Sequence, residues 1–217
     1  KGYLPHPRPR AAYAAMITRF DAEVGALLEA VERNGVADNT IIIVTSDNGP
    51  SWIGGVDMEF FDSSGGLRGR KAQLFEGGIR VPTVVWWPSV IEAGSENNSP
   101  SSFWDWYPTL MQVSKGNAPA CDGVSLVPIL TGNDKQKRRG LYWEHGNVMV
   151  YRNGDWKLML KKTKQGTDVM LFNLRNDPSE QINRAEEFQA KVNQLKQEAM
   201  SSRTASIEFP SFLDKEQ

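Results

Sequence analysis

An apolar strand followed by a polar turn constrains this chain more than any other sequence feature. The run Ile41-Ile42-Ile43-Val44 has the length and the β-branched content of a buried strand, and Ser46-Asp47-Asn48-Gly49 follows it. In α/β proteins, the loops after such strands present ligands to a metal or a substrate. Asp47 and Asn48 offer one anionic and one neutral oxygen, which suits a hard cation such as calcium. Taken alone, the same residues are more often an ordinary turn held by side-chain to backbone hydrogen bonds.

A basic cluster lies downstream of this turn. It reads Leu67-Arg68-Gly69-Arg70-Lys71, and five residues after Lys71 the string Glu76-Gly77-Gly78-Ile79-Arg80-Val81-Pro82 opens a second β-branched and aromatic run. Clustered cations usually form only a solvated face. Here the flanking glycines allow close backbone approach, and guanidinium and ammonium groups suit an oxyanion. The cluster therefore predicts a loop that approaches an anionic group.

Taken together, these motifs resemble the C-terminal half of a formylglycine-dependent sulfatase of the arylsulfatase type, in the alkaline phosphatase superfamily. The resemblance rests on four segments in the order found in that family: the helix end at Phe20 to Gly25, the strand and turn from Asn39 to Gly49, the basic loop, and Glu76 to Pro82. It runs from about residue 11 to about residue 180.

The resemblance implies a metal site and a catalytic cation. In the family, an Asp-Asn pair at the end of a strand helps to hold a calcium ion, and Asp47 and Asn48 match that pair. A lysine before the Glu-Gly-Gly motif contacts the sulfate, and Lys71 stands at that position. As a compact point charge, lysine can stabilise negative charge that builds up as an ester bond breaks. Glu76 and Arg80 are expected to hold loop geometry instead.

The nucleophile motif of the family is absent from these residues. The family makes formylglycine from Cys or Ser in a Cys/Ser-x-Pro/Ala-Ser-x-Arg context, and no such string occurs here. The single cysteine, Cys121, lies in Ala-Cys-Asp-Gly-Val and is expected to be an ordinary buried or loop thiol. We therefore expect a missing N-terminal segment to supply the formylglycine and the remaining calcium ligands, and this chain to be inactive alone.

Further candidate residues could contact a substrate. Arg68 belongs to the basic loop, and Trp52 follows the Asp-Asn pair closely enough to stack on a sugar, whereas the other tryptophans suit the core. His145, in Tyr-Trp-Glu-His-Gly-Asn, is either a substrate contact or a structural histidine beside an aromatic strand. His6 lies in a proline-rich approach to the first helix and is expected to be a linker residue rather than a catalytic one.

Periodicity predicts the order of elements along the chain. We expect a helix over Ala11 to Asn34 with one apolar stripe, strands at Ile41 to Thr45 and Arg80 to Trp87, and a helix within Phe103 to Lys115 that begins near Pro108. Four short strands should follow at Leu141 to Glu144, Val148 to Arg152, Trp156 to Lys161 and Val169 to Asn173, separated by glycine-containing turns. A closing helix should span about Ala185 to Met200.

These elements and the resemblance together predict an α/β fold with two parts. Residues 1–135 would form part of an alkaline phosphatase-like sheet sandwiched by helices, and residues 136–217 a small antiparallel β-sheet subdomain with one covering helix.

Composition excludes some partner classes. The chain has 217 residues, 40% hydrophobic residues and a formal net charge of −1, so it can bury a core and shows no bias toward nucleic acid. No apolar stretch approaches the roughly 20 residues that a membrane-spanning helix needs. The resemblance suggests a periplasmic or secreted protein.

The sequence leaves three functions open. The first, implied by the resemblance, is hydrolysis of a sulfate ester on a sulfated small molecule or saccharide, with a carbohydrate as the expected substrate and Ca²⁺ as cofactor. The second is a phosphatase or phosphodiesterase of the same superfamily, because fold does not fix chemistry. The third is a catalytically inert folded or binding module. The upstream nucleophile would separate the first two, and an aryl sulfate assay would test the third.

Overall fold

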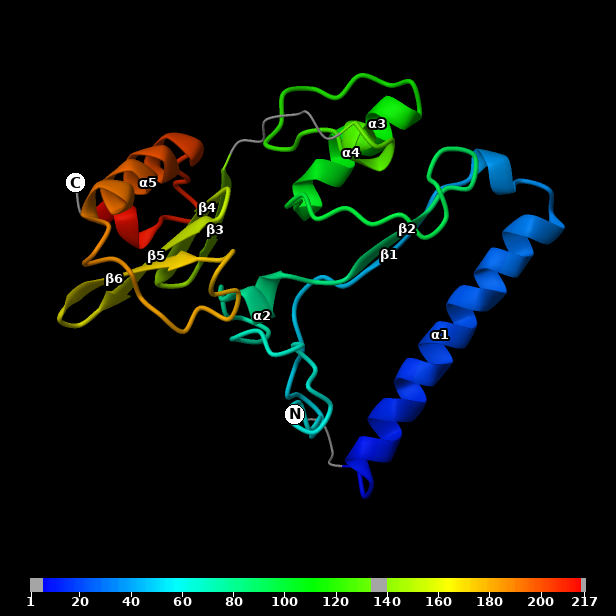
Figure 1. Ribbon diagram of the computed structural model, residues 1–217, viewed down its shortest axis with the longest axis horizontal. Coiled ribbons are helices and arrows are strands. Elements are labelled where there is room, and N and C mark those ends of the chain that lie inside the picture. The colour runs from blue at the N-terminus through cyan, green and yellow to red at the C-terminus, as the bar shows by residue number, and fades with distance from the viewer. Residues whose placement is uncertain (1–5, 134–139, 216–217) are drawn as a thin grey trace. The chain divides into compact units, whose positions relative to one another are not determined.

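The computed structural model describes residues 6–133 and 140–215, and its elements are labelled in Figure 1. The chain divides into two compact units. The first unit is built from the chain up to Asp21, from Thr45–Thr83 and from the chain after Gly140, and the second from Ala22–Val44 and Val84–Arg139. The predicted boundary at residue 135 lies outside the described residues and stays a prediction.

The long helix α1 spans Pro9–Arg33, close to its predicted bounds. Proline is well suited to the first helical position, and Gly35, with a φ of +66°, ends the helix because only glycine adopts the left-handed region freely. Within the described residues no side chain of α1 is buried, and half of its predicted apolar stripe is exposed, with Phe20 at 55% exposure. The helix prediction is therefore confirmed, whereas its stripe is only partly covered by the described residues.

The second unit contains a two-stranded sheet followed by two short helices. Strands β1 (Ile42–Thr45) and β2 (Thr83–Trp86) form a two-stranded sheet. The 3₁₀ turn η2 (Phe103–Asp105) leads into α3 (Trp106–Val113), and α4 (Val127–Leu130) packs on α3. The helix α3 begins two residues before Pro108, as predicted. The fully buried Asp105 carboxylate accepts hydrogen bonds from the backbone N–H groups of Ser102 and Val124, which fixes the loop before α4.

The first unit holds a four-stranded antiparallel sheet in the order β3-β4-β5-β6. Its strands are β3 (Leu141–His145), β4 (Val148–Asn153), β5 (Trp156–Thr163) and β6 (Gly166–Asn173), so all four predicted strands are present. Two-residue turns join β3 to β4 and β4 to β5, and in each turn a glycine, Gly146 or Gly154, takes a positive φ.

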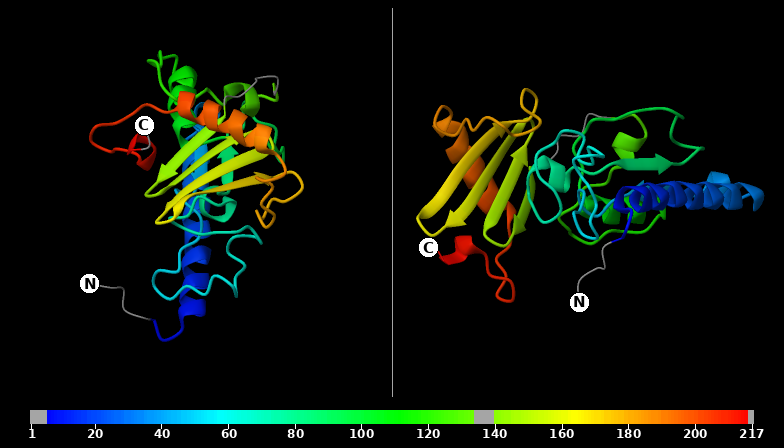
Figure 2. Two further views of the ribbon diagram at one scale, coloured as in Figure 1. Left: turned by 90° about the vertical axis from the view of Figure 1, so that its left-hand side faces the viewer. Right: turned by 90° about the horizontal axis from the view of Figure 1, so that it is seen from below.

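One face of this sheet packs against α5 (Gln189–Ser202), as Figure 2 shows. The core between them consists of strand residues spaced two apart and helix residues three or four apart. It is formed by Met149, Tyr151, Leu158, Leu160, Leu171, Val192, Leu195 and Ala199. The predicted covering helix is therefore confirmed, although it begins four residues later than predicted. The last described element is the 3₁₀ turn η3 (Phe212–Lys215).

The segment around residue 76 covers the opposite face of the sheet. Phe75 contacts Phe172 of β6 with ring centroids 6.3 Å apart, and residues Glu76–Ile79 form the short helix α2. The sequence predicted a Gly-Gly turn followed by a strand from Arg80. Instead, the turn is helical and the strand begins three residues later, because the buried contacts of Glu76 hold the first turn of α2 in place.

Candidate active site

The turn after β1 presents two oxygen-bearing side chains. The Ser46 hydroxyl donates to the Asn48 carbonyl at 2.8 Å, and the Asn48 amide nitrogen donates to the Gly49 carbonyl at 2.9 Å. This bond uses the side-chain nitrogen of Asn48 and leaves its side-chain oxygen available as a ligand. Asp47 is exposed, and its carboxylate makes no hydrogen bond or ion pair with any described residue. Both groups are hard oxygen donors, so they fit a calcium ion, which needs further ligands as well.

The described residues do not complete a metal site. Within residues 6–133 and 140–215, no group of three or more His, Cys, Asp or Glu side chains is placed to hold a metal ion. Asp47 and Asn48 thus provide two ligand residues with three side-chain oxygens between them, and the other ligands of a calcium ion would come from elsewhere.

Glycines bring three loop segments into close contact. The Gly49 N–H donates to the Gly78 carbonyl at 2.9 Å, and the Gly77 N–H donates to the Arg68 carbonyl at 2.7 Å. A Cβ atom on Gly49 would lie 1.9 Å from the Gly77 carbonyl oxygen, and one on Gly77 would lie 2.6 Å from the Gly69 carbonyl oxygen. Only glycine fits these positions. The turn after β1, the basic loop and α2 are therefore locked together through their backbones.

Lys71 lies next to the Asp-Asn turn. Its backbone N–H donates to the Pro50 carbonyl at 2.9 Å, two residues beyond Asn48. The side chain is half-buried, and its ammonium makes no hydrogen bond or ion pair with the described residues. The structure brings the backbones of the predicted metal ligands and the predicted catalytic lysine together. That the ammonium points at the same cavity stays a prediction.

The two loop residues assigned to substrate have different surroundings. Trp52 is 47% exposed, and the guanidinium carbon of Arg70 lies 4.4 Å from its ring centroid. Arg68 donates to the Glu180 carbonyl at 2.8 Å and lies over the Phe75 ring at 3.9 Å. These contacts give Arg68 a part in holding the loop, and its part in substrate binding stays a prediction.

The histidines and the cysteine lie on the surface. His145 is the exposed last residue of β3 and makes no hydrogen bond or ion pair within the described part of the chain. His6 accepts a hydrogen bond from the Arg8 N–H at 3.0 Å, just before α1, which agrees with a linker role. Cys121 is exposed in a loop, one of the two settings expected for it. A substrate contact by His145 stays a prediction.

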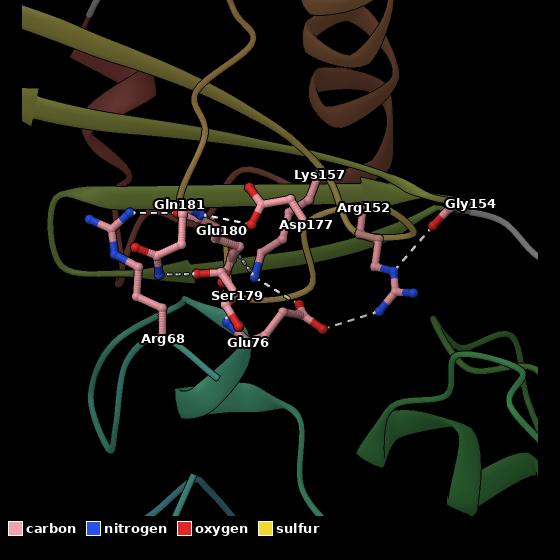
Figure 3. Close-up of polar contacts among 9 residues, drawn as sticks. All are labelled: Arg68, Glu76, Arg152, Gly154, Lys157, Asp177, Ser179, Glu180 and Gln181. Carbon is pink, nitrogen blue, oxygen red and sulfur yellow. Dashed lines mark hydrogen bonds and ion pairs between the residues drawn. The ribbon is translucent and has the colours of Figure 1, made fainter. Parts of the chain in front are cut away.

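A buried ion cluster, which the sequence did not predict, lies behind α2 (Figure 3). The Lys157 ammonium is 2.8 Å from a carboxylate oxygen of Glu76 and 2.8 Å from one of Glu180. The Arg152 guanidinium reaches Glu76 at 3.4 Å. Burial raises the pKa of the Glu180 carboxyl, and the Lys157 ammonium opposes that rise. Successive strand residues point to opposite faces, so Lys157 lies on the face opposite to Leu158 and Leu160, which pack toward α5.

Comparison with known proteins identifies the family. A family model described as Sulfatase matches residues 3–116, and one described as N-sulphoglucosamine sulphohydrolase, C-terminal, matches residues 69–205. Arylsulfatase A of Bos taurus is 35% identical over 162 residues, which cover 71% of this chain and 31% of that protein. The chain spans between about a fifth and a third of the length of the curated relatives it matches.

Solved structures give the same result for the fold. A structure of Ps i-CgsB in complex with k-i-k-neocarrahexaose matches with a TM-score of 0.76 and 28% identity, over 90% of this chain and 43% of that chain. A sulfatase structure from work on glycosaminoglycan metabolism by Bacteroides thetaiotaomicron matches with a TM-score of 0.73 and 25% identity, over 91% of this chain and 46% of that chain. The predicted α/β class of alkaline phosphatase-like type is confirmed. The chain belongs to the sulfatase family.

Proposed function

We propose that this chain is the C-terminal part of a sulfuric ester hydrolase that removes sulfate from a sulfated substrate. The observation that carries the proposal is the junction of the Asp47-Asn48 turn with the Lys71 loop through the Lys71 to Pro50 and Gly49 to Gly78 hydrogen bonds. Membership of the sulfatase family supports the reaction class. The predicted division into residues 1–135 and 136–217 is retained as part of the proposal.

Asp47 and Asn48 would hold a calcium ion together with ligands from another segment. When bound, calcium would polarise the sulfate group. Asp47 contributes the anionic ligand, and Asn48 contributes a neutral oxygen whose orientation is set by the bond from its amide nitrogen to Gly49. The nucleophile, a formylglycine by resemblance, would come from a segment joined to this chain. A protein with both segments is called the complete enzyme below.

Lys71 would stabilise charge on the sulfate and on the leaving-group oxygen. Its backbone is fixed against Pro50, and its ammonium has no partner among the described residues that would compete for it. A fixed cation beside the reacting group lowers the barrier because it acts where negative charge develops.

The proposed substrate class is a sulfated saccharide. Trp52 presents an exposed ring near the Asp47-Asn48 turn, and the stacked Arg70 guanidinium restrains that ring. An aromatic ring held in this way can pack against the apolar face of a sugar. Arg68 and His145 are kept in the proposal as substrate contacts. The family resemblance also favours a periplasmic or secreted protein, and no described helix has both the length and the apolar character to cross a bilayer.

An assay of three activities tests the proposal. The complete enzyme should hydrolyse a generic aryl sulfate in the presence of calcium and should be much slower on the matching aryl phosphate. The 217-residue chain, lacking the nucleophile motif, should show no turnover. Faster phosphate than sulfate hydrolysis would favour the phosphatase alternative, and inactivity of the complete enzyme on both would favour the inert module. Robust turnover by the chain alone would contradict the mechanism.

A further inference from the structure

The ion cluster behind α2 consists of three fully buried charged side chains from three separate segments. Glu76 is the first residue of α2, Lys157 lies in β5, and Glu180 lies in the loop after β6. The side-chain exposures are 3% for Glu76 and 0% for Lys157 and Glu180. In Figure 3 the Lys157 ammonium lies between the two carboxylates. The cluster therefore ties α2 and the loop after β6 to the middle of the sheet.

Strand register explains how Lys157 reaches this position. Lys157 is paired with Arg152 of β4 on one side and with Phe172 of β6 on the other. Residues paired across antiparallel strands point to the same face. This face is the one opposite α5, where Phe75 packs on Phe172 and Arg152 reaches Glu76. The apolar contact and the ion cluster thus lie side by side on one sheet face.

Stability alone is a poor explanation for such a cluster. Removing charges from water is energetically costly, and well-packed apolar residues of similar volume often give equal or greater stability. The contact of Lys157 with Glu180 is an ion pair in which the carboxylate oxygen has no well-aligned hydrogen-bond donor. Buried ions differ from apolar groups because they are satisfied in only one arrangement of the segments that carry them.

The arrangement that the cluster requires includes the backbone of the candidate active site. The Glu76 N–H donates to the Glu180 carboxylate at 2.5 Å. The next two residues, Gly77 and Gly78, bond to the Arg68 carbonyl and the Gly49 N–H. Glu76 is therefore only one or two residues from the bonds that join α2 to the basic loop and to the turn of Asp47.

The loop after β6 also holds the start of the basic loop. The Arg68 guanidinium donates to the Glu180 carbonyl at 2.8 Å, and the Ser179 hydroxyl donates to the Gly66 carbonyl at 2.8 Å. Glu180 thus contacts α2 through its carboxylate and the basic loop through its carbonyl. Both ends of the segment from Arg68 to Glu76, which contains Lys71, depend on it.

We propose that Lys157 and Glu180 are positioning residues for the reaction: their buried ion pairs with Glu76 set where the loop carrying Lys71 lies relative to the Asp47 turn. The four-stranded sheet, which carries none of the proposed metal ligands, would then control turnover through the placement of that loop. This inference rests on the proposed function for its consequence in catalysis, although the placement itself can be measured without any activity.

The first experiment measures placement in the 217-residue chain. Glu180→Gln keeps the side-chain volume and an acceptor for the Glu76 N–H but removes the charge facing Lys157. We expect amide hydrogen exchange at Gly49, Lys71 and Gly77 to become about tenfold faster, while amides in the α5 core are unchanged. Glu187→Gln is the matched control, since Glu187 forms an exposed ion pair with Arg184. Unchanged exchange at all three amides would overturn the inference.

The second experiment measures turnover in the complete enzyme. Glu180→Gln should lower kcat on an aryl sulfate by about 100-fold with little change in KM, because a displacement of about 1 Å can cost that much. Faster exchange with unchanged kcat would overturn the link to catalysis. If the complete enzyme without substitutions has no sulfatase activity, and Glu180→Gln still shows faster exchange, the proposed function is wrong. The inference that the cluster positions the loop of Lys71 would still hold.

A second variant covers the possibility that Glu180→Gln does not fold. The triple variant Glu76→Gln, Lys157→Met, Glu180→Gln removes all three fully buried charges, and Arg152, which loses Glu76 as a partner, keeps 21% of its side chain exposed to solvent. The variant is therefore expected to fold. It should keep a near-normal melting temperature, show the same faster exchange and have the same lowered kcat. A normal kcat in this folded variant would mean that the cluster serves stability only.

Discussion

The backbone N–H of Gly49 donates a hydrogen bond to the carbonyl oxygen of Gly78 at 2.9 Å, across 29 positions of sequence (78 minus 49). This bond joins the turn that carries Asp47 to α2, and it requires glycine at position 49, where a Cβ atom would lie 1.9 Å from the Gly77 carbonyl oxygen. The candidate site is thus held by backbone contacts in which glycine is a steric requirement.

The first prediction concerns that requirement. Gly49→Ala would place a Cβ atom 1.9 Å from the Gly77 carbonyl oxygen, so one loop must move. We expect a loss of about 1–3 kcal/mol, seen as a melting temperature several degrees lower. Gly25→Ala, in α1 with nothing within 4 Å of its Cβ position, is the control and should be neutral or slightly stabilising. Equal melting temperatures for the two variants would show that the contact can relax freely.

The second prediction concerns the metal. Asp47→Ala in the complete enzyme should abolish calcium binding in a calorimetric titration, because it removes an anionic ligand from an ion that needs several oxygens. Asp122→Ala, which removes another exposed loop carboxylate, should bind calcium normally. Undiminished affinity in Asp47→Ala would remove this residue from the metal site.

The third prediction concerns the substrate. Trp52→Ala should raise KM for a sulfated oligosaccharide by about tenfold, equivalent to about 1.4 kcal/mol, and leave KM for a small aryl sulfate unchanged. The reason is that only the saccharide is large enough to reach the exposed ring. Steady-state kinetics on both substrates measure the difference. An equal loss on the two would mean that Trp52 supports the loop and does not contact sugar.

The fourth prediction concerns how the stability of the fold depends on pH. Bidentate contact with Arg203, followed by a hydrogen bond from the Ser211 N–H, lowers the pKa of the Asp214 carboxyl from its ordinary value. A carboxyl group whose pKa is lower in the folded than in the unfolded state stabilises the fold at pH values above its unfolded-state pKa. That stabilisation is lost as the pH falls through its folded-state pKa. Asp214→Asn should therefore melt below the parent at neutral pH, and the gap should close as the pH falls below the ordinary aspartate pKa and through the lowered pKa of the folded state.

The control for the acid prediction is Asp168→Asn. Asp168 is exposed and makes no hydrogen bond or ion pair through its carboxylate with the described residues. Its melting temperature should follow the parent at every pH. A gap between Asp214→Asn and the parent that stays constant down to the lowest pH would contradict the assignment to charge.

The sequence was sufficient for the four-stranded sheet and its covering helix. Short apolar runs in β4 and β5, together with glycines at the two-residue turns, indicate the strands and the hairpins that join them. It was also sufficient to place the Asp47 turn and Lys71 in one region, through the resemblance to sulfatases. Local pattern and motif order carry these features, so no knowledge of distant contacts was needed.

Features that depend on distant contacts were missed. The helix α2 contains Gly77 and Gly78, which have low helix propensity, and it is held in place by contacts of Glu76 more than 80 residues away in sequence. From the sequence, Lys157 is expected to be exposed, because lysine is rarely buried. In the structure, two carboxylates from other segments pair with its ammonium and make its burial possible. No local pattern indicates either partner.

Kinetics of Lys71→Ala in the complete enzyme test the central claim most directly, that the loop of Lys71 and the turn of Asp47 form one sulfate site. We expect kcat on an aryl sulfate to fall about 100- to 1000-fold with an almost unchanged melting temperature, and Lys71→Arg to recover little of it, because the planar guanidinium cannot occupy the same point. Lys164→Ala, in the exposed turn after β5, should retain normal turnover. Near-normal turnover in Lys71→Ala would contradict the account and reduce the basic loop to a solvated surface.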